Sequence, residues 1–170
     1  MGKLATAAFV LASFVAFTAS SQATLITFDD LTFAGVFAPI ANGYQGLNWT
    51  NFFAENTTLS ANPSGYRNNV VSAPNVAFNG FGTAAAFSNG TFTLNSFDLG
   101  AAWNNGLVVT LVGKLNGVTI DTASFTVNAT GRAVLETLNW TGINEVDWSS
   151  AGGVPAGIPP VPGRSSCSTI

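Results

Sequence analysis

Short β-rich runs separated by clusters of Gly, Asn and Pro fill the chain, and no window after Ala23 carries a sustained helical period of apolar residues. This pattern limits the fold, because a helix without an apolar stripe has no face to bury on a core. We expect about ten short strands, a number typical of a jelly-roll-like antiparallel β-sandwich in an all-β fold. The predicted strands lie at 25–31, 46–54, 70–72, 76–78, 85–88, 92–94, 98–103, 107–115, 118–127, 133–140 and 145–149.

The clearest local unit is a hairpin at 107–127. An Asn-Gly pair at 116–117 separates two strand-like runs, and both residue types accept the positive φ of a type I′ turn. The inward-facing apolar positions of the second arm change phase between Ile120 and Phe125. We therefore expect a β-bulge at 121–123 that restores the phase.

The chain divides into a leader, a domain and a tail. Residues 1–23 are predicted to be a secretory signal peptide, because Lys3 precedes an uncharged, mostly apolar stretch that ends in small residues before Thr24. An uncleaved membrane anchor is the alternative; after cleavage we expect an extracellular chain with no membrane contact. Residues 24–151 are predicted to form the β-sandwich and 152–170 a Pro/Gly-rich tail, because proline lacks the donor of a central strand.

Composition removes several classes of function. The chain contains no His, which excludes Ser–His and Cys–His catalytic pairs and histidine–metal sites. Its formal charge of −3 gives no basic surface for phosphates, so we expect no nucleic-acid partner. Only 8% of the residues are charged and 47% are hydrophobic, which favours a folded domain over a disordered chain. We expect a protein without catalytic activity.

Four segments carry a resemblance to a known group of proteins: LITFDDL at 25–31, NGYQGLNW at 42–49, NVAFN at 75–79 and LNSFDLGAAW at 94–103. Over about 25–153, the chain resembles secreted β-sandwich proteins found among PEP-CTERM-type bacterial exported proteins and small fungal-type secreted proteins. The sorting tail of the bacterial members is absent here. The resemblance implies a jelly roll that looks like a carbohydrate-binding module, with secretion and glycan binding.

Asp29 and Asp30 are the candidate metal ligands. Neighbouring residues of a strand point to opposite faces, so the two carboxylates share one ion only if the backbone changes direction at the strand end. Modules similar to these often hold structural Ca²⁺ near their chain ends, and carboxylate and carbonyl oxygens suit that ion. The alternative is a turn with solvated acids.

Glu145 and Asp147 are the candidate catalytic pair. Residues two apart in a strand share a face at about 6.5 to 7 Å, a separation near that of an inverting glycosidase. The alternative is a solvated strand face, because any two acids with this spacing produce the same match.

Aromatic and amide side chains suggest a glycan-binding surface. Aromatic faces stack on sugar rings while amides and guanidinium groups bond the hydroxyls. We expect Trp49, Trp140 and Trp148 inside the sandwich. The predicted ligand-binding residues occupy loop-like segments: Tyr44, Tyr66, Arg67, Trp103, Asn104 and Asn105.

Five asparagines fit the N-glycosylation pattern, which acts only in a host that glycosylates: Asn48, Asn56, Asn89, Asn128 and Asn139. Cys167 is the single cysteine, so the chain forms no internal disulfide, and we interpret it as an incidental thiol.

The sequence therefore supports three functional hypotheses. The first is a secreted non-catalytic module for cell-wall or matrix glycans, without a cofactor unless structural calcium is bound. The second is a secreted structural or interaction protein, such as an effector, matrix or coat component, with a protein partner. The third is a carboxylate-pair glycoside hydrolase. The oligomeric state is left open.

Overall fold

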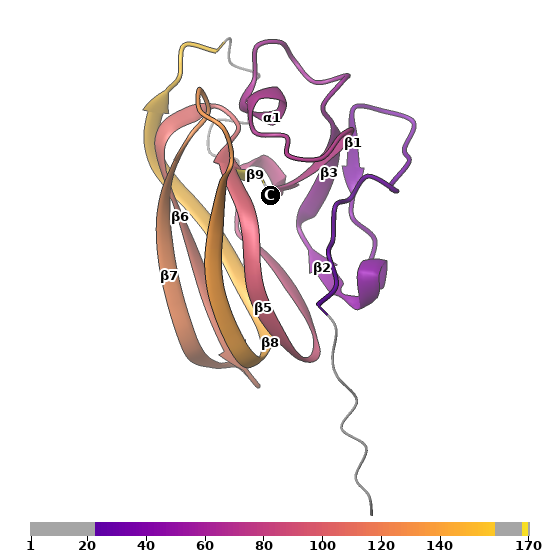
Figure 1. The fold of residues 1–170 in the computed structure, drawn as a ribbon, viewed down its shortest axis with the longest axis vertical. Helices are drawn as coiled ribbons and strands as arrows, with labels where there is room; N and C mark the ends of the chain where they lie inside the picture. The colour runs from indigo at the N-terminus through magenta and orange to yellow at the C-terminus, as the bar shows by residue number, and fades with distance from the viewer. Residues whose placement is uncertain (1–22, 159–167, 170) are drawn as a thin grey trace, which may run out of the picture.

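Two antiparallel β-sheets pack into a sandwich in the computed structural model, which describes residues 23–158, 168 and 169 (Figure 1). The five-stranded sheet has the order β2–β5–β8–β6–β7, and the second sheet has the order β1–β3–β4–β9 followed by the end of β5. This architecture confirms the predicted all-β sandwich, with nine strands in the described part of the chain.

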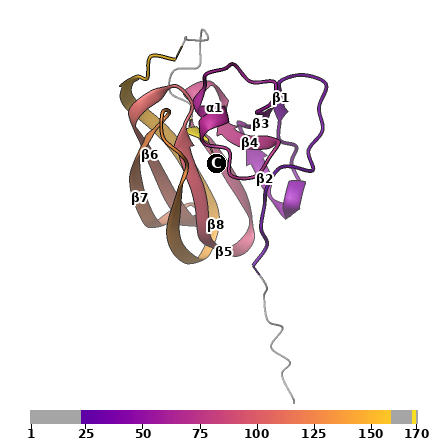
Figure 2. The same cartoon turned by 45° about the horizontal axis from the view of Figure 1, so that its top comes forward.

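The strands are β1 (Phe37–Pro39), β2 (Asn48–Thr50), β3 (Phe52–Asn56), β4 (Asn75–Asn79), β5 (Ala85–Ala101), β6 (Asn104–Leu115), β7 (Val118–Asn128), β8 (Val134–Pro155) and β9 (Ser168–Thr169). Three short helical turns complete the elements: η1 (Tyr44–Gly46), α1 (Gly65–Asn68) and η2 (Gly80–Gly82). In Figure 2, β1 and β3 lie on one side of the molecule, and β6 and β7 lie on the other.

The predicted hairpin is confirmed as β6–β7. Asn116 and Gly117 have φ values of 52° and 79°, as a type I′ turn requires, and Leu115 pairs with Val118. The pairing shifts next to Gly113, where Ile120 has no opposite residue. The bulge therefore lies one residue before the predicted position.

β5 and β8 form one long antiparallel ribbon instead of the five separate strands expected. Their pairing slips between Ser88 and Phe92, and both strands turn back on themselves there (Figure 1). The two halves of the ribbon, before and after this slip, face each other. The ring centroids of Phe97 and Trp148, one from each half, lie 5.4 Å apart. A methyl group on Gly113, which pairs with Val146 of one half, would lie 2.8 Å from the Trp140 ring of the other. The ribbon thus contributes to both layers of the sandwich.

Aromatic side chains fill the space between the layers. Trp49, Trp140 and Trp148 are 7%, 8% and 1% exposed, so the prediction that they lie inside is confirmed. Phe52 links the layers by edge contacts with Trp49 at 5.5 Å and Trp148 at 5.8 Å.

Three sequence-based boundaries are wrong. Residues 25–31 and 70–72 form no strand, and β8 continues through 152 to Pro155, inside the predicted tail. Gly152 pairs with Leu107 and Pro155 with Asn104. Beyond Trp148, β8 pairs in the described structure with β6 alone. Pro155 therefore lies at a sheet edge, where a residue without a backbone N–H is tolerated. Most of the predicted signal peptide, at 1–22, and Cys167 lie outside the described residues.

Candidate functional site

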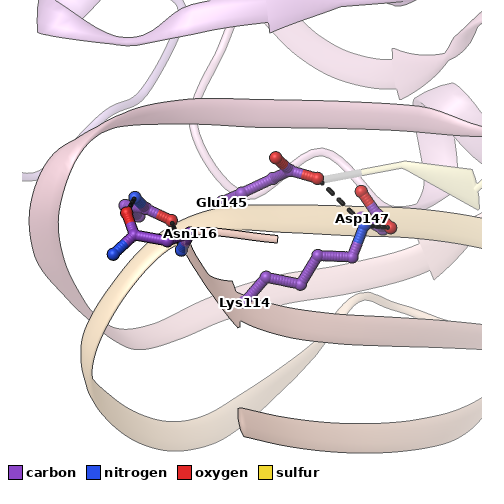
Figure 3. Close-up of polar contacts among 5 residues, drawn as sticks. Lys114, Asn116, Glu145 and Asp147 are labelled. Atoms are coloured by element: carbon purple, nitrogen blue, oxygen red, sulfur yellow. Dashed lines mark hydrogen bonds and ion pairs between the residues drawn. The ribbon is translucent and has the colours of Figure 1, made fainter. Parts of the chain in front are cut away.

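A cluster of three charged side chains lies on the outer face of the five-stranded sheet. Lys114 of β6 pairs with Glu145 of β8 across the ladder, and Val112 pairs with Asp147. The Lys114 ammonium lies 3.0 Å from Glu145 Oε1 and 2.5 Å from Asp147 Oδ2, as Figure 3 shows. The lysine therefore holds both carboxylates at one place on the sheet.

The strand period explains why these groups meet. Val109 and Leu111 of β6 point into the core, which sends Thr110, Val112 and Lys114 to the outer face. The same alternation buries Val146 and Trp148 of β8 and turns the two acids outward. The prediction that the acids share a face is confirmed. The position of Lys114 between them was not predicted from the sequence.

A shallow hollow of about 390 Å³ adjoins Asp147 on this face. Alanines at 84–86 leave room there, because they carry no long side chain. The hydroxyl groups that line the hollow belong to Thr50, Thr110 and Ser149.

The electrostatics of the cluster differ from those of a glycosidase pair. Hydrogen bonds to Asp147 and Glu145 raise the pKa of Lys114, so the ammonium stays charged. A glycosidase needs one carboxyl group that keeps its proton at working pH, usually through burial. Here the charged ammonium of Lys114 lies against both acids.

Two of the predicted ligand-binding aromatics are buried, which corrects that prediction. Tyr66 is 0% exposed and Trp103 is 5% exposed. Their rings contact each other at 5.8 Å, and Tyr66 also packs on Phe78 at 5.3 Å. The loop-like sequence around them hid this role, because α1 and the turn before β6 fold them into the core.

The predicted polar ligand-binding residues bond to the protein's own backbone. Arg67 donates to the carbonyl oxygens of Thr58 at 2.7 Å and Ser60 at 3.0 Å. Asn104, which is buried, donates to Gly152 O at 3.1 Å. Asn105 Oδ1 accepts from the Ala129 and Thr130 amides at 3.0 and 3.2 Å. These side chains stabilise loops, and the structure does not gather them around a ligand.

Tyr44 is the one predicted ligand-binding aromatic that stays partly exposed. Its hydroxyl donates to Asp30 Oδ1 at 2.6 Å, and its ring stacks on Phe28 at 5.9 Å. Burial of the phenol and the hydrogen bond to Asp30 raise the pKa of Tyr44 to about 12. Tyr44 therefore fastens the N-terminal segment to η1.

Asp29 and Asp30 lie in a turn after Phe28, which has a φ of 64°. Asp29 Oδ1 accepts a hydrogen bond from the backbone N–H of Asn75 at 3.1 Å, whereas Asp30 Oδ1 accepts one from the Tyr44 hydroxyl. Within 23–158 and 168–169, no group of three His, Cys, Asp or Glu side chains lies close enough to hold a metal ion. Calcium is also bound by carbonyl oxygens, so the site at Asp29 and Asp30 stays a prediction.

Four of the five asparagines in N-glycosylation patterns are exposed: Asn48, Asn89, Asn128 and Asn139. Asn56 is half-buried, and its Oδ1 accepts from the Thr58 amide at 3.0 Å and the Thr58 hydroxyl at 2.7 Å. Asn89 donates to Gly46 O, and Asn128 accepts from the Gly106 amide at 2.8 Å. Modification at Asn48 or Asn139 would disturb none of these bonds.

A larger cleft, of about 780 Å³, opens between β4 and β5. Residues 23–28 line it from the N-terminal segment, Asn75 and Val76 from β4 and residues 92–98 from β5, and the buried Trp49 and Trp148 also border it. No sequence signal pointed to this cleft, because only the fold brings these segments together.

Comparison of the whole chain with protein-family models and with curated proteins finds no match. Among the helices of the described segments, none has the length and apolar character needed to cross a membrane. The functional argument therefore depends on the outer face of the five-stranded sheet and on the cleft.

Proposed function

We propose that this protein is a secreted, non-catalytic module that binds glycans on the outer face of the five-stranded sheet. The observation that carries the proposal is the cluster of Lys114, Glu145 and Asp147 beside a mostly apolar hollow whose lining includes Thr50, Thr110 and Ser149. The predicted signal peptide at 1–23 supports a location where wall or matrix glycans are found.

The chemistry of this face suits a polyhydroxylated ligand. Carboxylates accept hydrogen bonds from sugar hydroxyls, the ammonium donates, and Thr and Ser hydroxyls do both. Hydrogen bonds to charged groups are about twice as strong as neutral ones. Because the three charged groups already hold one another in place, little side-chain freedom remains to be lost on binding.

The site differs from the one that the sequence suggested. All four tryptophans are buried, at 8% exposure or less, so no indole platform supports stacking. Recognition on this face would combine hydrogen bonds to the charged cluster with apolar contacts in the hollow, where Val112 and Ala86 lie.

The test is retention on a panel of wall and matrix polysaccharides, measured by affinity electrophoresis and calorimetry. We expect at least one polysaccharide to bind, and Asp147→Ala to weaken that binding by about tenfold or more, since a hydrogen bond to a charged group contributes about 1.5 to 3 kcal/mol. Asp121→Asn, which removes a carboxylate from β7, is the matched control and should bind normally.

Absence of retention across the panel would overturn the proposal, as would equal binding by Asp147→Ala and the wild type. Release of oligosaccharides that stops in Glu145→Gln would instead identify a hydrolase. These assays leave the cleft between β4 and β5 unaltered, which allows its role to be tested separately.

A further inference from the structure

β7 is the last strand on one side of the five-stranded sheet (Figure 1). In the described structure it pairs with β6, and no strand lies on its other side. Among the described residues, 118–127 form backbone hydrogen bonds with β6 and with no other segment. Every second residue of an antiparallel strand directs its N–H and C=O groups to the same side, so β7 presents a row of unpaired donors and acceptors there.

The other edges of the described sheets are shorter, less regular or covered. β1 and β2 each have three residues. Residues 134–141 of β8 pair with β5 on one side, but Asn139 has a φ of 55° and the register shifts beside it. The cleft between β4 and β5 is bordered by the N-terminal residues 23–28. β7 has eleven residues, no Gly or Pro and no positive φ, so its edge is the best template for another strand.

Asp121 marks the point from which this edge is open to pairing. It pairs with Gly113, which faces the Trp140 ring, so the Asp121 side chain points toward the inner face of the sheet. The bulge at Ile120 lies directly before it. Bulges and inward-pointing charges oppose the addition of a strand at an edge. Residues 122–128, which follow, carry no charge.

The segment 122–128 alternates between polar and apolar side chains. The polar ones are exposed on the outer face: Thr122, Ser124, Thr126 and Asn128. The apolar ones pair with buried residues of β6 and face inward: Ala123, Phe125 and Val127. Phe125 packs on Phe97 at 5.8 Å but is only half-buried, since no described strand lies beside it at this side of the sandwich. A strand added here would cover its ring.

An antiparallel, twofold pairing of this segment with itself matches like with like. Centred on Phe125, it sets Phe125 opposite Phe125 of the second copy, Ala123 opposite Val127, and Ser124 opposite Thr126. Aromatic and hydroxyl pairs of this kind stabilise antiparallel sheets. The register pairs even positions with even and odd with odd, so the backbone groups that β6 does not use meet one another. Asp121 stays outside the ladder, and no charges face each other across it.

From this complementarity we propose that two copies of the chain pair through residues 122–128 of β7, which joins their five-stranded sheets into one continuous sheet. A second copy supplies the neutral, alternating strand by symmetry. The proposal does not depend on glycan binding, because the charged cluster lies on β6 and β8 and the pairing uses the free edge of β7.

The test is the mass of the chain in solution, measured by sedimentation equilibrium over a range of concentrations. We expect twice the mass of one chain at high concentration. Thr126→Lys places two ammonium groups on neighbouring cross-strand positions and should raise the dissociation constant of the dimer about tenfold or more. Thr119→Lys is the matched control, because Thr119 is equally exposed on β7 but lies outside the ladder, and it should dimerise as the wild type does.

A mixture of two variants tests the register. Ser124→Glu should weaken the dimer as Thr126→Lys does, because each variant repels itself. Mixed together, the two should form a heterodimer more stable than either homodimer, since Glu at 124 of one copy then faces Lys at 126 of the other. Circular dichroism and urea unfolding confirm that both variants are folded.

Hydrogen exchange locates the interface. We expect exchange of the 122–128 amides to slow as the concentration rises through the dissociation constant. A single-chain mass at all concentrations would overturn the proposal, as would a dimer that Thr126→Lys leaves unchanged. Slow exchange of these amides in the monomer would assign the edge to another segment of the same chain. Protection that appears only when a different protein is added would assign it to that partner. Either result would also overturn the proposal.

Discussion

Apart from the three-residue β2, the strands of the five-stranded sheet are much longer than the strands β1, β3, β4 and β9 of the second sheet. In the five-stranded sheet, β8 pairs with β6 from Lys114–Glu145 to Asn104–Pro155 and also pairs with β5. In the second sheet, three residues of β1 and two of β9 continue the order on either side of β3 and β4. Long strands supply their own neighbours, whereas short strands depend on contacts with distant segments.

Burial differs between the two sheets in the same way. β6 alternates between buried and outward positions, as a half-exposed strand does, but every residue of β4 is buried. The N-terminal segment is fastened to β4, because Asn75 donates to the carbonyl oxygens of Phe28 and Leu31, both at 2.9 Å. The short ladders of the second sheet are therefore supplemented by side-chain hydrogen bonds to the N-terminal segment, whereas the five-stranded sheet has much longer ladders.

The largest expected effect comes from the residue that joins the sheets. Trp148 is 1% exposed, its ring contacts Phe52 and Phe97, and its Nε1 donates to Ser168. We expect Trp148→Ala to lower the free energy of unfolding by about 3 to 5 kcal/mol, the usual loss for a buried aromatic. Urea unfolding followed by circular dichroism measures it.

Trp148→Phe is the control, because it keeps most of the ring volume and loses the hydrogen bond. A loss below about 1 kcal/mol in Trp148→Ala would mean that the two sheets are not stabilised through this residue.

A smaller effect is expected when one glycine in each sheet is replaced by alanine. A methyl group on Gly100 would lie 2.3 Å from Asn69 Cγ, and one on Gly113 would lie 2.8 Å from the Trp140 ring. Both Gly→Ala variants should lose about 1 to 3 kcal/mol through overpacking. Gly100→Ala should lose more, because the Asn69 amide is fixed by bonds to Gly65 O and Ala101 O, both at 2.9 Å.

Thermal unfolding of the two variants measures this difference. Gly90→Ala is the control and should stay within about 0.5 kcal/mol of the wild type, because nothing lies within 4 Å of the added methyl group. A larger loss in Gly113→Ala than in Gly100→Ala would contradict the view that Asn69 is the more rigid neighbour.

The smallest effect concerns the contact that fastens the N-terminal segment. Tyr44→Phe removes the hydrogen bond to Asp30 and should cost about 0.5 to 1.5 kcal/mol at neutral pH. The pKa of Tyr44 is raised from 10.0 to about 12, so folding favours the neutral phenol. The stabilisation is complete below pH 10 and is lost as the pH rises from 10 to about 12.

Urea midpoints of the wild type and Tyr44→Phe at pH 8, 10 and 12 test this dependence. The difference between the two proteins should shrink over that range; a difference that stays constant to pH 12 would show that the phenol proton is not involved.

The sequence predicted features that depend on neighbours along the chain. The type I′ turn at Asn116 and Gly117 needs only the φ preferences of two residues, and the shared face of Glu145 and Asp147 follows from the strand period. The inward positions of Trp49, Trp140 and Trp148 follow from their size and apolar surface.

Features that depend on distant segments could not be predicted in this way. Lys114 contacts the two acids only because β6 lies beside β8. The sequence alone does not indicate which residues of these two strands pair. Tyr66 and Trp103 look exposed in a Gly- and Asn-rich context, yet they pack against each other across a separation of 37 positions, from 66 to 103. The cleft likewise depends on the order of β4, β9 and β5.

The order of β8 in the chain affects how the protein is made. β8 lies between β5 and β6 in the five-stranded sheet but follows β5, β6 and β7 in the sequence. A growing chain that has left the ribosome as far as β7 therefore has the β6–β7 hairpin but no strand to join it to β5. Until β8 emerges, the apolar faces of those strands stay open to water, and a chaperone has its longest opportunity to bind them.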